Sequence, residues 1–254
     1  MLKVWRGLRR KLLNEGNLKK YLLYAIGEIL LVMIGILLAL QVNNWNNSHN
    51  AKEEEFQYLR ALQDEFQNNL NEVNRNLALT DSIQKACNHI LNFPINGPDF
   101  EEMKLAASNR DAYRFPPKFL QSPGILADLT SSGNLSKLSN QNLRLLIQNW
   151  YAILKEVEDE EAELWLHRTN AIQYMLHNSS FRGFMVSLDD QLLGPLNSRE
   201  EFKLNLKQMH QDQYFDNLNV MYAILNTSLK TQVYPKLKAN IEAILEEIAR
   251  DLEA

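Results

Sequence analysis

The chain has 254 residues, of which 45% are apolar and 23% are charged, an ordinary balance for a globular protein. It contains only nine glycines and seven prolines, which argues against β-sandwiches, barrels and low-complexity disorder and favours helices. The single cysteine, Cys87, excludes an intrachain disulfide framework and a multi-cysteine metal cluster. The net charge of −4 is unevenly distributed, because residues 1–20 hold seven Lys or Arg and one Glu.

Residues 1–20 are predicted to form a basic amphipathic arm. Leu2, Trp5, Leu8 and Leu12 fall on one helical face, and the basic residues surround the others. This pattern is typical of a short interfacial helix that anionic lipid holds at the cytoplasmic surface of a membrane. Because no other basic patch supports so short an arm, the sequence does not predict nucleic-acid binding.

Residues 21–42 are predicted to cross a membrane as one helix. The segment begins YLLYAIGEILLVMIGILLAL, and these 20 residues cover roughly 30 Å as a helix, the thickness of a bilayer core. Seven Lys or Arg lie before the span, whereas Lys52 is the only Lys or Arg between the span and Glu55. The positive-inside rule therefore places the N-terminus in the cytoplasm and the remainder outside it. A cleaved signal peptide is the alternative, and the residues around Leu40 are poor for cleavage.

Glu28 is the only charged residue within the span, and two interpretations stay open. An acid inside a membrane is a candidate functional residue. Alternatively, Glu28 reaches toward the inner headgroups, near Lys19 and Lys20. Gly35 and Ala39 form a small-xxx-small pair, a weak indication of a helix-pairing face.

The residues after the polar juxtamembrane segment 43–50 are predicted to form a helical domain over 51–254. Apolar residues recur at spacings of three and four over 51–92, and again from Asn140 to Asn178, which predicts two long helices. Shorter helices are predicted over residues 99–108, 125–131, 198–211, 214–231 and 235–253. The fold class is therefore all-α, with one N-terminal transmembrane helix followed by an extracytoplasmic helical bundle with two long helices.

Two stretches interrupt this helical pattern. Residues 111–124 contain three prolines and cannot form one continuous helix. They are either a packed connector or a recognition loop, because long irregular segments often carry function. Residues 181–195 are predicted to form a loop, since Gly183, Gly194 and Pro195 interrupt the pattern.

Two charged residues fall on the predicted apolar face of the helix from Asn140 to Asn178. At about 100° per residue, this face holds Leu146, Trp150, Leu154, Val157, Leu164, Ile172 and Met175. Glu161 and Arg168 lie on it as well, about 10 Å apart along the axis, so each needs a partner from another element. They form either a structural arrangement or the lining of a polar ligand pocket.

The chain lacks the sequence signatures of common enzymes. It has no Gly-rich phosphate loop, no G-x-S-x-G and no H-E-x-x-H. None of its five histidines follows a Glu by three residues, which excludes the usual di-iron bundle. The acidic run Glu156–Glu163 is typical of a solvated helix face, or of a weak cation or basic-partner surface. We therefore predict no catalytic residue, no cofactor and no metal.

The run KYLLYAIGEILLVMIGILLALQVNNWN (Lys20–Asn46) resembles an uncharacterised family of bacterial single-span membrane proteins, with an AIGEI…IGI…ALQ-NNWN anchor. The resemblance continues more loosely through Ser131–Tyr151. It implies a membrane anchor and a helical extramembrane domain, but no activity, cofactor or catalytic residue. The matching anchor residues include Glu28, Gln41, Asn43, Asn44 and Trp45.

These observations predict a non-enzymatic protein, namely a membrane-anchored binding or scaffolding module of the bacterial envelope. The alternative is a ligand-sensing bundle that signals through its single span to a separate partner. The expected partners are the lipid bilayer and either another protein or further copies of the chain. The expected location is the bacterial inner membrane, in a single pass, with the N-terminus cytoplasmic and the bulk of the chain periplasmic.

Overall fold

A computed structural model describes most of the chain, and the described part is helical without a strand. The predicted loop 181–195 lies outside the described residues, as do most of the predicted arm and the first residues of the helix predicted over 198–211. The described residues are 18–97, 100–122, 124–180 and 204–253.

Helix α2 runs from Leu18 to Leu91, a length of 74 residues. It contains the predicted span, the juxtamembrane residues 43–50 and the long helix predicted over 51–92. The chain divides into two compact units, residues 1–57 and 58–254, and α2 contributes to both.

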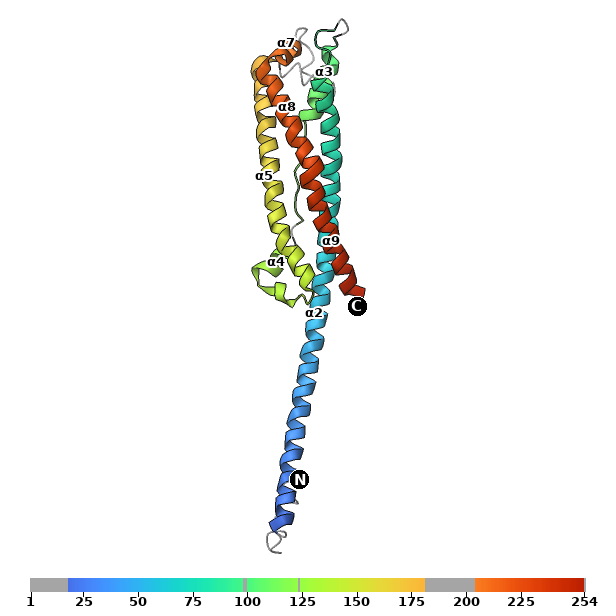
Figure 1. Ribbon diagram of the computed structural model, residues 1–254, viewed down its shortest axis with the longest axis vertical. Helices are drawn as coiled ribbons and strands as arrows, with labels where there is room; N and C mark the ends of the chain where they lie inside the picture. Colours follow the sequence, from blue (N-terminus) through green and yellow to red (C-terminus); the bar gives the residue numbers. More distant parts are fainter. Residues whose placement is uncertain (1–17, 98–99, 123, 181–203, 254) are drawn as a thin grey trace, which may run out of the picture. The chain divides into compact units, whose positions relative to one another are not determined.

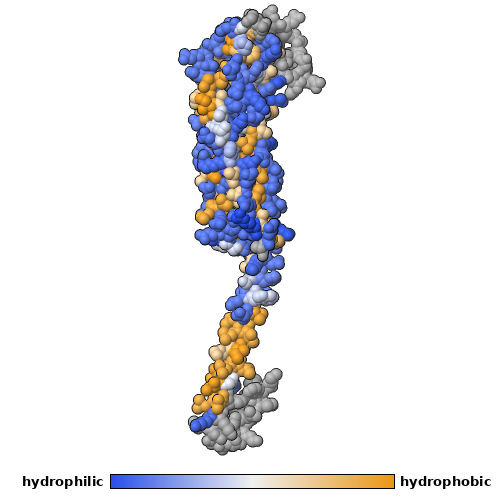
Figure 2. Space-filling view, turned by 45° about the vertical axis from the view of Figure 1, so that its right-hand side comes forward, coloured by the Kyte–Doolittle hydropathy of each residue, from blue (hydrophilic) through white to orange (hydrophobic). Residues whose placement is uncertain are grey.

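In the first unit, the large apolar side chains of α2 that the structure describes are exposed. Their exposed fractions include 71% for Leu23, 67% for Leu31 and 65% for Val42. Figure 2 shows these side chains as a hydrophobic band. Within the described part of the chain, one helix is long and apolar enough to cross a membrane, and its apolar window is wholly unburied.

The second unit is a bundle of antiparallel and connecting helices, drawn from teal to red in Figure 1. Helix α5 packs against both α8 and α9 along its length. The elements that follow α2 are α3 (Glu102–Tyr113), α4 (Ile125–Ser131), a 3-10 turn (Asn134–Lys137), α5 (Gln141–Asn178), α7 (Leu206–Gln211), α8 (Gln213–Ser228), the π turn η3 (Leu229–Val233) and α9 (Tyr234–Glu253).

Large aromatic side chains fill the interior of this bundle. Trp150 of α5 is fully buried and contacts Phe66 of α2 edge to face, with ring centroids 5.1 Å apart. Phe119, from the segment between α3 and α4, contacts the same indole at 6.1 Å. Such pairs contribute about 0.5–1.5 kcal/mol beyond the burial of their area. The stripe predicted on residues 51–92 is therefore the face of α2 that is buried in the bundle.

Capping residues in the sequence correctly predicted the bounds of α4 and the start of α5. Helix α4 has the predicted bounds, and Gly133 follows it with φ +73°, a left-handed conformation that glycine adopts without strain. Helix α5 begins where Asn140 caps it, because the Asn140 side chain accepts a hydrogen bond from the Leu143 amide at 3.0 Å.

Three other predicted boundaries were wrong, namely both ends of α3 and the start of α7. Helix α3 begins at Glu102 and continues to Tyr113, beyond the predicted end at Ser108, because Ala112 and Tyr113 are buried in the bundle. Helix α7 begins only at Leu206, since Asn205 takes a left-handed conformation with φ +54°.

The predicted break between the last two helices does not occur. The π turn η3 joins α8 to α9 without a loop, which keeps Leu229, Val233 and Tyr234 buried. A π turn holds one more residue per turn than an α-helix, so it shifts which side chains face inward while the backbone remains hydrogen-bonded. Pro235 lies in the first turn of α9, as predicted.

Candidate functional site

Glu161 bonds two segments that are distant in sequence. Its Oε1 accepts hydrogen bonds from the Phe119 amide at 2.7 Å and from the Tyr234 hydroxyl at 2.8 Å. Burial raises the pKa of the Glu161 carboxyl, and the two hydrogen bonds oppose that rise. Burial also raises the pKa of Tyr234, which keeps its hydroxyl as the donor. The carboxylate therefore ties α9 to the irregular segment that precedes α4.

Arg168 holds the start of the same irregular segment. Its Nε donates to the Tyr113 carbonyl at 2.6 Å, and its Nη2 donates to the Arg114 carbonyl at 3.1 Å. Partial burial lowers the pKa of the guanidinium, although it stays protonated. Glu161 and Arg168 thus each take partners from another element, and those partners are mostly backbone groups.

Helix α2 also holds this irregular segment, which we call the connector and whose described residues are 114–122 and 124. The Asn76 side chain makes a two-way contact with Lys118: its Oδ1 accepts from the amide at 2.9 Å and its Nδ2 donates to the carbonyl at 3.2 Å. Asn69 accepts from the Ser122 amide at 2.8 Å. Both asparagines are buried, so these contacts replace the water that the connector backbone would otherwise bind.

Glu65 caps α4 from another helix. Its Oε2 accepts from the Leu126 amide at 3.0 Å, while the N-cap residue Gly124 supplies no side-chain cap. A Cβ atom at position 124 would lie 2.6 Å from this oxygen, so a larger residue there would displace the carboxylate from its capping position. Burial of Glu65, which is 5% exposed, raises the pKa of its carboxyl.

These five side chains form one arrangement, which we call the connector clamp. Sequence reasoning found its two α5 members but missed the three on α2. A signal was present, because the latter are polar residues on the otherwise apolar stripe of residues 51–92. The clamp consists of Glu65, Asn69, Asn76, Glu161 and Arg168.

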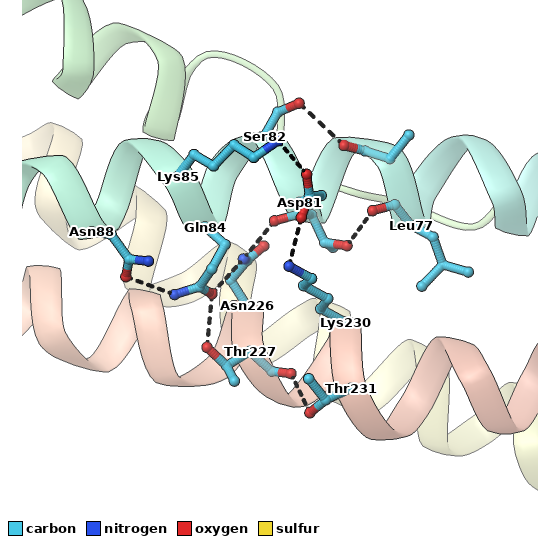
Figure 3. Close-up of polar contacts among 12 residues, drawn as sticks. Leu77, Asp81, Ser82, Gln84, Lys85, Asn88, Asn226, Thr227, Lys230 and Thr231 are labelled. Atoms are coloured by element: carbon cyan, nitrogen blue, oxygen red, sulfur yellow. Dashed lines mark hydrogen bonds and ion pairs between the residues drawn. The ribbon is translucent and has the colours of Figure 1, made fainter.

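A second polar contact region, the α2–α8 seam, lies farther along α2 (Figure 3). Asp81 accepts from Lys230 at 2.6 Å and from Lys85 at 2.7 Å, and these ammonium groups lower the pKa of its carboxyl to about 2. Gln84 Oε1 accepts from the Thr227 hydroxyl at 2.7 Å and from Asn226 Nδ2 at 3.1 Å. These side chains align α2 with α8 and η3.

Two surface grooves flank this seam. The first, of about 380 Å³, lies between α2 and α3 and includes Lys85, Asp111 and Arg114. The second, of about 390 Å³, lies between α2 and α8 and contains no charged residue, so we call it the neutral groove. Neither groove includes Glu161 or Arg168. The neutral groove is lined by Gln84, Asn88, Leu91, Val220, Ala223, Ile224, Thr227, Ser228 and Gln232.

The other residues singled out from the sequence lie apart from these regions. Cys87 is buried, and burial raises the pKa of its thiol to about 12, so it is unreactive at neutral pH. In the acidic run, Glu156 pairs with Lys236 of α9 at 2.5 Å on a solvent-accessible face. Glu28 lies half-buried on the apolar part of α2. Among the described residues, no three His, Cys, Asp or Glu side chains gather as a metal site.

Comparison with known proteins gives one match. The model of a family of unknown function, DUF6090, matches residues 28–174, more than half of the chain. The chain belongs to this family. The match covers the apolar segment from Glu28 onward, the connector and all five clamp residues, and it confirms the expectation of an uncharacterised family. No curated protein and no solved structure matches the chain.

Proposed function

We propose that this DUF6090 protein is a membrane-anchored scaffolding module of the bacterial envelope. The observation that carries the proposal is the apolar segment of α2, whose large aliphatic side chains are exposed from Leu22 to Val42. Burying a side chain such as Leu or Ile in an apolar medium is favourable by about 1.5–3 kcal/mol. A bilayer supplies that medium, and the helix hydrogen-bonds its own backbone, as a spanning segment must.

The distribution of basic residues supports an orientation for this anchor. Seven Lys or Arg lie within residues 1–20, before the apolar segment, and Lys52 is the only basic residue between that segment and Glu55. The N-terminus is therefore placed in the cytoplasm and the bundle in the periplasm, across the inner membrane.

The clamp supports scaffolding over ligand sensing. Glu161 and Arg168 were the residues on which a polar ligand pocket depended. Both form hydrogen bonds to the backbone of residues 113–119, and Glu161 also accepts from Tyr234, so they act as internal braces. A bundle braced in this way presents a fixed outer surface to a partner.

The buried Cys87 makes the anchor and its orientation directly testable. A cysteine introduced as Asn47→Cys lies on an exposed position after the apolar segment, and Asn17→Cys lies before it. A membrane-impermeant maleimide should label the first variant in intact cells and the second only after lysis. The unmodified chain is the background control, since its only thiol is 2% exposed.

Extraction completes the test. The protein should remain in the membrane pellet at alkaline pH and dissolve in detergent. Release at alkaline pH, or a mature N-terminus near Gln41, would overturn the anchor. Labelling of Asn17→Cys in intact cells would overturn the orientation.

A further inference from the structure

Helix α8 is apolar on both sides, unlike a helix that lies at the edge of a closed bundle. Its inner side buries large residues such as Phe215 and Tyr222. Its outer side exposes Val220, Met221 and Ile224, by 36%, 40% and 54%. A helix with apolar residues all round is normally covered on all sides. The outer side of α8 therefore lacks a cover within the described part of the chain.

The surface beside these residues can be buried at little cost in free energy. Leu91 of α2, 38% exposed, extends the apolar surface across the neutral groove. Three polar side chains of the groove bond one another: Thr227 donates to Gln84, and Gln84 Nε2 donates to Asn88 Oδ1 at 3.2 Å (Figure 3). An occupant need not supply those hydrogen bonds, so covering these groups with an apolar side chain costs little.

Charge indicates what the occupant is. No charged residue occurs from Asn217 to Leu229, although 23% of the chain is charged. Residues 21–254 carry a net charge of about −10, so most faces of two copies repel each other. In a two-fold interface, residues on the axis meet their own counterparts, and a charge there would face a like charge. The neutral groove is a surface that meets this requirement.

The size of the surface indicates how the copies meet. Helix α8 has 16 residues, so it is about 24 Å long, and a strip 10–20 Å wide covers about 250–500 Å² on each copy. The total is at or below the roughly 1,000 Å² of a specific interface between free proteins. Two chains anchored in one membrane meet at a much higher effective concentration, which compensates for a small interface.

We propose that the outer side of α8 and the neutral groove bind a second copy of this chain within the same membrane. The inference rests on the proposed anchor. It names a partner for the scaffold, and it assigns α8 as the surface that forms the pair.

The test uses the full-length protein in native membranes and a short bismaleimide crosslinker. We expect Val220→Cys and Ile224→Cys to give a dimer-sized product, at a yield about tenfold or more above Leu145→Cys. Leu145 is a matched control, because it is 55% exposed on α5 and lies away from the groove. The unmodified chain should give no product, because Cys87 is buried.

A second pair of variants separates pairing from folding. Adding Ile224→Glu to the Val220→Cys chain should abolish the product, because two like charges would meet, whereas adding Leu145→Glu should leave it. Circular dichroism of the purified chains should show equal helix content in both. Equal crosslinking at Leu145→Cys, or a product containing a different protein, would overturn the inference. Retention in the membrane without a dimer overturns only the pairing, and a dimer in protein released at alkaline pH overturns only the anchor.

Discussion

The connector clamp and the α2–α8 seam are built by the same helix with the same kinds of polar side chain, yet they differ in access to solvent. In the clamp, Asn69 and Asn76 are 0% and 2% exposed, and they bond backbone groups of the connector. In the seam, the side chains of Lys230 and Asp81 are 32% and 39% exposed, and they bond each other. Water replaces a lost partner at the Lys230–Asp81 ion pair but not at the two clamp asparagines. Burial, more than the number of contacts, should therefore decide what each region contributes to stability.

The largest effect should come from Asn76→Ala. The change leaves the amide and the carbonyl of Lys118 without their buried partner, which should lower the free energy of unfolding by about 3 kcal/mol. Thermal unfolding of the full chain in a non-ionic detergent, followed by circular dichroism, measures the loss. Asn92→Ala is the control, because the exposed Asn92 side chain lies just after α2 and donates to the nearby Asn88 carbonyl. Equal losses in the two variants would contradict the role assigned to burial.

A buried histidine outside the clamp tests the same principle through pH. His210 receives a hydrogen bond from Asn109 Nδ2 at 3.1 Å and packs against Phe215, and burial lowers its pKa from 6.5 to about 4. The folded state then binds fewer protons than the unfolded state between these values. Stability from His210 is therefore present above pH 6.5 and is lost as pH falls toward 4. The loss should be about 2 kcal/mol between pH 7 and pH 4.5.

The measurement compares the unfolding free energies of the wild type and His210→Gln across this pH range. The difference between the two chains isolates His210, because all other titrating groups are common to both. The wild-type profile alone does not, because the raised pKa values of Glu65 and Glu161 act in the opposite sense. Those two carboxyls favour the folded state at low pH and disfavour it as pH rises through their folded pKa values. The exposed His177 is the control, and His177→Gln should follow the wild type. A wild-type profile parallel to that of His210→Gln would refute the prediction.

Arg168→Leu should have an intermediate effect. The Tyr113 carbonyl loses a partner in a buried position, while the exposed Arg114 carbonyl regains water, so a loss of about 1–2 kcal/mol is expected. Chemical unfolding should show this destabilisation, with Arg75→Leu as the control, since Arg75 is 70% exposed and pairs only within α2. A chain that folds with unchanged stability but loses a ligand would instead support the sensing alternative.

The smallest effect should come from Asp81→Asn in the seam. Its two ion pairs are solvent-accessible, and salt screens such pairs. The shift in the unfolding midpoint should be less than half of that for Arg168→Leu, and it should shrink further at high salt. A midpoint shift as large as that of Asn76→Ala, or one insensitive to salt, would remove the distinction between clamp and seam.

Short-range signals in the sequence predicted the elements whose ends depend on a few neighbouring residues. Asn140 caps α5 and Gly133 follows α4 because each acts on backbone groups within three residues. The ends of α3 and the join of α8 to α9 were not predicted. They depend on the burial of Tyr113 and Tyr234 against helices that are distant in sequence. The residues next to each tyrosine carry no pattern that predicts this burial.

The candidate site divides in the same way. Glu161 and Arg168 stood out because charges on an apolar helical face need partners, and that argument uses one helix alone. Their partners lie at the end of α3, on the connector and on α9, 42 to 73 positions away from Glu161 and 54 to 55 from Arg168, and no spacing rule connects them.

By itself, the sequence determined the all-helical class, the apolar segment that a membrane would accept, and the need for partners at Glu161 and Arg168. These features follow from composition and helical periodicity, which act within one element. Only the tertiary structure decided that the connector backbone supplies those partners, that Glu65 caps α4 from another helix, and that α8 keeps an uncovered neutral side. Each of these depends on which surfaces meet when the helices pack, because a polar group's cost and an apolar group's gain are set by what lies across from it.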